Sequence, residues 1–300
     1  TKLKGLATFV LGANSFSGSN SNGRFAGTPN TTAFNQANYG ATVFNYDLRL
    51  NFDTSFTGKD LLRTTLRAAN AQGTNGSAYG SGLAQMEAFF EQPAGDNVVG
   101  VNRLFYNFPL GNQLSVTTGA MVRVDDAGML GLWPSVYPAD TVLDFFTYAG
   151  APGAYNLAGL GAGAGFVYSP NWAKGLTISQ NYVSGNGSSY AGTQGTAGTG
   201  NPGVGGVMTN GAGSAAVSQI GYASDKTPII GGSYGLAFAY TYSQNLNLPV
   251  GTPLALQYSD YNNGANGYSS GNNYGLSGYW KPSKAGLIPS ISWGFGGGSY

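Results

Sequence analysis

Residues 44–53 alternate apolar and polar side chains without a break, reading Phe-Asn-Tyr-Asp-Leu-Arg-Leu-Asn-Phe-Asp. Because successive side chains of an extended strand point to opposite faces, this stretch sorts into two faces as a strand and would not do so as a helix. The apolar face holds Phe44, Tyr46, Leu48, Leu50 and Phe52, and the other holds Asn45, Asp47, Arg49, Asn51 and Asp53. An unbroken, aromatic-rich face opposite a charged face is typical of a wall between hydrocarbon and water, as in a transmembrane β-barrel.

The same alternation recurs along the chain. Further strands are expected at residues 2–11, 61–71, 98–108, 113–123, 160–168, 176–183, 214–222, 233–242, 272–280 and 287–295, making about eleven in all. The connections between them alternate between long and short, as in outer-membrane barrels, whose extracellular loops are long and periplasmic turns short. The sequence therefore predicts a single domain over residues 1–300, an all-β, antiparallel transmembrane β-barrel of the outer-membrane porin type.

Some segments carry more detailed expectations. In the strand at residues 113–123, Leu114, Val116 and Val122 are expected on the apolar face, with Thr117 and Arg123 opposite. Within the long connections, residues 83–91 could form a short helix or a strand, and residues 139–148 could form a short helix.

Composition narrows the classes of function. Charged residues are 8% of the chain, against about 25% in a typical soluble domain, so most of the surface either lies outside water or is covered by uncharged polar groups. A net charge of +1 without a basic run argues against nucleic acid as a partner. The chain has no cysteine and no histidine, which removes disulfides, thiolate and imidazole metal sites and Ser-His-Asp catalysis. No catalytic residue, cofactor or metal site is predicted, and we do not expect an enzyme.

Charged side chains on the polar face are the candidate pore lining: Asp47, Arg49, Asp53, Arg63, Arg67, Arg103 and Arg123. One interpretation is that the arginines are simply solvated or paired with Asp47 and Asp53. The other sets them against an acidic loop at residues 125–144 that folds inward and carries Asp125, Asp126, Asp140 and Asp144. Such a constriction would have a transverse field and would sort solutes by size and charge.

Four stretches carry a family resemblance: residues 4–12 (KGLATFVLG), 45–70 (NYDLRLNFDTSFTGKDLLRTTLRAAN), 103–111 (RLFYNFPLG) and 129–156 (MLGLWPSVYPADTVLDFFTYAGAPGAYN). They resemble the cyanobacterial outer-membrane porins related to the carbohydrate-selective OprB porins and often labelled iron-uptake porins. The resemblance implies an outer-membrane channel that passes small polar solutes passively, namely inorganic ions including iron, and sugars. It implies no defined set of substrate-binding residues.

Further expectations concern the whole protein. Members of this family carry a signal peptide, an S-layer-homology domain and a coiled coil before the barrel, which links it to the peptidoglycan cell wall, and further strands after it. None of these is within the 300 residues. Because an open barrel edge would expose unpaired backbone groups to lipid at several kcal/mol each, we expect the chain to be a fragment of the full barrel, incomplete at the C-terminus. Barrels of this type commonly assemble as homo-trimers.

The leading alternative is a secreted, surface-displayed β protein, such as an adhesin or an S-layer-like protein, without a pore. It would share the low charge and the Gly/Asn/Thr-rich loops but would bury its apolar faces against one another. A carbohydrate hydrolase on a β scaffold is a more distant third.

Overall fold

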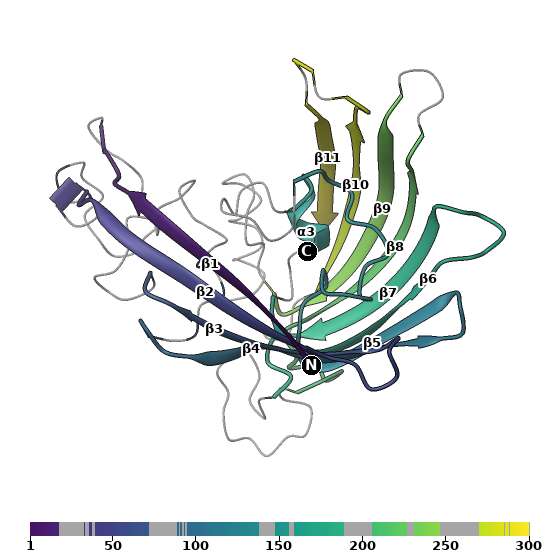
Figure 1. Cartoon of the computed structure of the whole chain (residues 1–300), viewed down its shortest axis with the longest axis horizontal. Helices are drawn as coiled ribbons and strands as arrows, with labels where there is room; N and C mark the ends of the chain where they lie inside the picture. The colour runs from purple at the N-terminus through teal and green to yellow at the C-terminus, as the bar shows by residue number, and fades with distance from the viewer. Residues whose placement is uncertain are drawn as a thin grey trace. The chain divides into compact units, whose positions relative to one another are not determined.

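The structure is a computed structural model, and it describes residues 1–17, 33, 36–37, 40–71, 89, 91, 93, 95–137, 148–155, 159–188, 206–226, 231–246, 270–284, 286–287 and 289–299. These residues form an all-β protein whose strands pair in the order in which they occur along the chain (Figure 1). The strands are β1 (Lys2–Gly12), β2 (Val43–Thr54), β3 (Leu61–Ala69), β4 (Gly100–Leu110), β5 (Leu114–Val122), β6 (Gly161–Tyr168), β7 (Leu176–Ser184), β8 (Ser214–Ser224), β9 (Ser233–Gln244), β10 (Ser270–Lys281) and β11 (Ile291–Ser299). A short helix, α3 (Pro152–Tyr155), lies between β5 and β6.

The eleven strands form one sheet, and the pairs whose registers are resolved are antiparallel. This confirms the predicted all-β, antiparallel architecture. β1 and β11 are the two end strands of the order, so the described pairings form an open sheet, whereas the sequence predicted a transmembrane barrel of which this chain is a fragment. The chain divides into two compact units, which in the described residues are 1–53 with 64–102, and 54–63 with 103–137 and 148–299.

The expected alternation of long and short connections is present. The short ones are residues 55–60, 111–113, 169–175, 225–232 and 282–290, and the long ones are residues 13–42, 70–99, 123–160, 185–213 and 245–269. In the turn between β4 and β5, Gly111 has φ of 74°, a left-handed conformation that glycine adopts without the steric penalty of a side chain. The segments 83–91 and 139–148 lie outside the described residues, except for Phe89, Glu91 and Tyr148.

Most of the exposed large apolar side chains of the strands lie on one side of the sheet, and the buried small and polar ones lie on the other. In β9, Phe238 is 46% exposed, whereas its neighbour Ala239 is 0% exposed. In β2, Phe44 is 66% exposed and Asp47 is 1% exposed. We call the first side of the sheet the apolar face and the second the polar face. A soluble sheet with one wet side normally has the opposite arrangement, with its apolar side chains buried.

The buried clusters of the second unit lie on the polar face. One consists of Phe105, Val122, Val124, Met129, Val183, Ala215 and Val217. The other joins α3 and the residues before it to β9 through Ala149, Ala151, Ala154, Tyr155 and Ala239. In both clusters, side chains from the long connection between β5 and β6 pack onto strand residues, so this connection covers part of the polar face.

The prediction that Val122 lies on the apolar face is wrong, because β5 contains an extra residue. Leu104 of β4 pairs with Met121 but the next residue, Phe105, pairs with Gly119, so one step along β4 matches two along β5. An extra residue in a strand reverses the faces of the side chains beyond it. Val122 is therefore completely buried on the polar face.

In the described part of the chain, no helix has both the length and the apolar character needed to cross a membrane.

Candidate functional site

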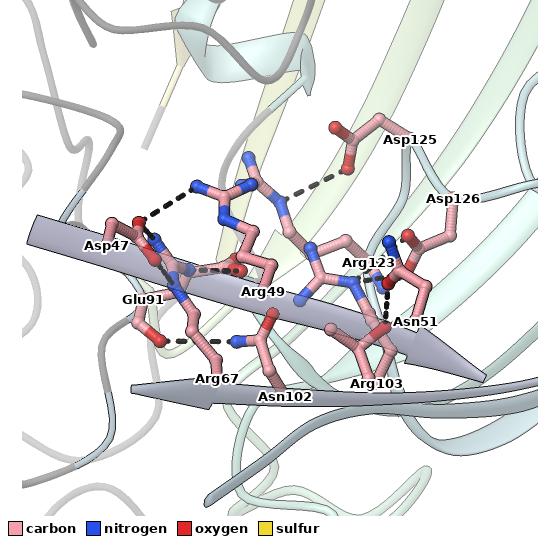
Figure 2. A network of polar contacts seen from close by, with 11 residues as sticks. Asp47, Arg49, Asn51, Arg67, Glu91, Asn102, Arg103, Arg123, Asp125 and Asp126 are labelled. Atoms are coloured by element: carbon pink, nitrogen blue, oxygen red, sulfur yellow. Dashed lines mark hydrogen bonds and ion pairs between the residues drawn. The ribbon is translucent and has the colours of Figure 1, made fainter. Parts of the chain in front are cut away.

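The polar face of the first unit carries a buried cluster of charges centred on Asp47 (Figure 2). The guanidinium of Arg67, on β3, donates to both carboxylate oxygens of Asp47, on β2, with distances of 3.0 Å from Nε to Oδ1 and 2.5 Å from Nη2 to Oδ2. Arg49 Nη2 lies 3.3 Å from Asp47 Oδ2, and Arg67 Nη1 lies 3.7 Å from Glu91 Oε2. Two cations and two anions therefore form one neutral group.

The polar face of the second unit carries two more ion pairs. Asp126 follows β5 and contacts Arg103 of β4, with 3.0 Å between Arg103 Nε and Asp126 Oδ1. It also accepts the backbone N–H of Arg123 at 2.7 Å. Arg123 Nε lies 3.1 Å from Asp125 Oδ1. Burial raises the pKa of Asp126 above the ordinary aspartate value, although Arg103 acts in the opposite direction.

These pairs bear on the two interpretations of the arginines. Asp125 and Asp126 contact Arg123 and Arg103 directly, as Figure 2 shows, and do not oppose them from a separate wall. Asp53 accepts a hydrogen bond from Lys4 at 3.0 Å. The guanidinium of Arg63 lies 6.0 Å from the ring centroid of Phe105, a cation–π distance. Asp140 and Asp144 lie outside the described residues.

Residues 123–137 and 148–155, which we call the inner strap, are bound to the polar face by hydrogen bonds from the strands. Five of these bonds run from a side chain on a strand to a backbone carbonyl of the strap. They are Thr117 Oγ1 to Ala127 O at 2.7 Å, Asn181 Nδ2 to Met129 O at 2.9 Å, Gln219 Nε2 to Leu132 O at 2.8 Å, Thr241 Oγ1 to Ala154 O at 2.7 Å and Ser277 Oγ to Ala149 O at 2.6 Å. The donors come from β5, β7, β8, β9 and β10, so the strap crosses the greater part of the second unit's sheet.

Small residues let the end of the strap approach the strands closely. α3 contacts β9, β10 and β11 (Figure 1). A Cβ at Gly275 of β10 would lie 2.8 Å from the Cβ of Ala151, and one at Gly294 of β11 would lie 2.0 Å from the carbonyl oxygen of Ala149. These positions accept only glycine while the strap lies where it does. The hydroxyl of Tyr155 donates to Gln219 Oε1 at 2.9 Å, and burial raises the pKa of Tyr155, which keeps the hydroxyl protonated.

The sequence reasoning named the charged residues of the polar face but missed the strand residues that hold the strap. Thr117 was placed on the polar face without a role, and Asn181, Gln219, Thr241 and Ser277 were not singled out. The sequence does contain an indication of this role: uncharged polar side chains at inward positions of strands require hydrogen-bond partners once they are buried. Among the described residues, no group of three or more acidic, histidine or cysteine side chains is arranged to hold a metal ion.

Comparison with known proteins gives relatives without an assigned role. No family model matches the chain. The uncharacterized protein alr4550 of Nostoc sp. strain PCC 7120 is 39% identical over 75 residues, which are 23% of this chain and 13% of that protein. The uncharacterized protein sll0772 of Synechocystis sp. strain PCC 6803 is 28% identical over 250 residues, which are 80% of this chain and 39% of that protein. The chain therefore spans well under half the length of these curated relatives.

Proposed function

We propose that this chain forms the wall of a water-filled channel in the outer membrane of a cyanobacterium, through which small polar solutes diffuse passively. The observation that carries the proposal is the inverted distribution of side chains in the sheet. Large apolar side chains are exposed on one face, whereas charged, amide and hydroxyl groups are buried and hydrogen-bonded on the other. An apolar outer band with a polar inner wall is the arrangement that transmembrane β-barrels need.

The apolar face forms continuous rows across several strands. Register places Ile178 opposite Ile220, Ile220 opposite Phe238, Phe238 opposite Leu276 and Leu276 opposite Phe295. All five are exposed large hydrophobic residues on β7 to β11. A contiguous apolar surface of this kind is unfavourable in water and favourable against acyl chains.

The polar face supports the aqueous side of the proposal. Hydrocarbon cannot satisfy the ion pairs around Asp47 and Asp126, because isolated polar groups in lipid cost several kcal/mol each. The strap binds to this face through its own backbone, which is tolerated at membrane depth only where it lies against protein or lines a water-filled cavity. In this proposal the strap narrows the channel from one side.

The resemblance to cyanobacterial porins supports the outer-membrane location, and it is the basis for proposing inorganic ions, iron among them, and sugars as solutes. Assembly as a homo-trimer and attachment to peptidoglycan through a separate N-terminal domain are proposals of the same kind. Closure of the sheet into a barrel is also part of the proposal, since an open edge in lipid would leave backbone groups unpaired.

Purification and reconstitution test the proposal. The complete protein should require detergent to stay in solution, and it should produce stepwise conductance when added to planar lipid bilayers. Liposome swelling with uncharged solutes of graded size would then give the size limit. A protein that is monomeric and freely soluble without detergent, and that leaves bilayers electrically silent, would instead support a secreted surface β protein.

A further inference from the structure

Charged residues are unevenly distributed over the strands. The strands β6 to β11 carry a single charged residue, Lys281, at the end of β10. The strands β1 to β5 carry all the other charged residues of the strands. They are Lys2, Lys4, Asp47, Arg49, Asp53, Arg63, Arg67 and Arg103. Apart from Lys281, the polar face of β6 to β11 therefore presents only uncharged groups.

The strap adds no charge where it covers these uncharged strands. Its residues 127–137 and 148–155 contain no Asp, Glu, Lys or Arg. They include Trp133, whose ring meets that of Tyr155 edge to face with 5.4 Å between centroids. The surface that the strap turns away from β7 to β10 is therefore also uncharged in the described residues.

Each charged cluster is balanced within itself. In the first unit, Arg49 and Arg67 contact Asp47 and Glu91, two charges of each sign. In the second unit, Arg103 contacts Asp126 and Arg123 contacts Asp125, again two of each sign. The field of a close ion pair falls off faster with distance than that of a single charge, and mobile ions screen it beyond a Debye length of about 8 Å at physiological ionic strength.

Resting on the proposed channel function, we infer that the conduit is electrically neutral: cations, anions and uncharged polar solutes of one size pass at comparable rates. Charge-selective pores present rings of unpaired charge of one sign to the solute. Here Arg49, Arg67, Arg103 and Arg123 are each paired with a carboxylate and fix the wall, and selection is by size and by hydrogen bonding. The relevant solutes are small and polar whatever their charge.

The inference can be tested by inserting the complete protein into a planar bilayer that separates two KCl solutions of different concentration and measuring the reversal potential. Potassium and chloride diffuse almost equally fast in water, so a neutral conduit should give a potassium-to-chloride permeability ratio within about twofold of one. This measurement needs no variant and does not depend on one folding correctly. A ratio far from one, in either direction, would overturn the inference while leaving the channel itself established.

Variants of one ion pair test the mechanism behind the neutrality. Asp126→Asn removes the negative charge that contacts Arg103 and should shift the ratio several-fold towards chloride. Arg103→Gln should shift it several-fold towards potassium, and the double variant should return close to the wild-type value. Asp225→Asn removes an exposed charge in the turn after β8 and is the matched control; it should change nothing.

The outcomes separate the two proposals. Single variants that conduct with an unshifted ratio would show that pairing does not set the neutrality, and this would overturn the inference. Heat-modified migration on gels shows whether each variant has folded. If the wild-type protein inserts into bilayers but carries no current, the channel function itself fails, and the inference fails with it.

Discussion

Replacing one side chain on the apolar face tests whether that face meets lipid. Phe238 lies near the middle of β9, between Ile220 and Leu276, and is 46% exposed. Buried aromatic side chains contribute about 150–250 Å² of surface, so about half of this, roughly 70–115 Å², would be in contact with acyl chains. At about 25 cal/mol per Å² of apolar surface removed from water, that contact contributes about 2–3 kcal/mol.

Phe238→Ala should therefore lower the free energy of unfolding in lipid vesicles by about 2 kcal/mol. Phe238→Lys should lower it further, because a lysine on the lipid face near the bilayer midplane itself costs about 2–4 kcal/mol. In a soluble β protein, a substitution at such an exposed position would change stability by only about 0.5 kcal/mol in either direction. The two proposals thus differ by several-fold in the predicted effect.

Denaturant titration of vesicle-reconstituted protein, followed by tryptophan fluorescence, measures these free energies. Leu287→Lys is a matched control, because Leu287 is fully exposed in the short connection between β10 and β11, outside the strands. It should leave the free energy of unfolding unchanged. If Phe238→Lys were as well tolerated as Leu287→Lys, the apolar face would not be in contact with lipid and the channel proposal would lose its main support.

Three other substitutions probe the polar face and a short turn. Gly275→Val should displace the strap and cost about 1–3 kcal/mol by overpacking against Ala151, with altered single-channel conductance, whereas Gly297→Ala, with open space around it, should do neither. Arg67→Met should lower the free energy of unfolding by about 3–5 kcal/mol, since it leaves Asp47 buried without this partner; a loss below 1 kcal/mol in the same titration would contradict this. Asp60→Asn should make the free energy of unfolding depend less on pH in the acid range. Hydrogen bonds, chiefly from Thr57, lower the pKa of Asp60, so its stabilisation is complete above the ordinary value of 3.8 and fades as pH falls below it. Unfolding titrations at stepped pH compare the two proteins, and parallel profiles would show that Asp60 is not responsible.

Much of the fold follows from the sequence because its period of two is unusually clean. Large apolar side chains occupy every second position over residues 44–52 of β2 and 234–242 of β9, and the sequence alone placed all eleven strands of the described residues. Val122 was misplaced because one extra residue in β5 shifts the register, and no local pattern marks where an extra residue will be accommodated.

The candidate site was predictable only in part. Alternation assigned Asp47, Arg49, Arg67 and Arg103 to the polar face, where the structure places them. The pairing of Arg103 with Asp126 could not be foreseen, because it depends on how the chain turns after β5. α3 was missed for a related reason: its four residues, Pro-Gly-Ala-Tyr, are too few to form a stable helix alone, and Ala154 packs on Gly275 of β10.

The hydrogen bonds that hold the strap have a consequence for how such proteins diverge. Every acceptor in that series is a backbone carbonyl, which all twenty amino acids possess, whereas every donor is a particular side chain on a strand. Replacing a side chain of the strap that faces the solute would leave all five bonds intact. Related proteins can therefore differ in the side chains of the strap that face the solute and still keep these five hydrogen bonds.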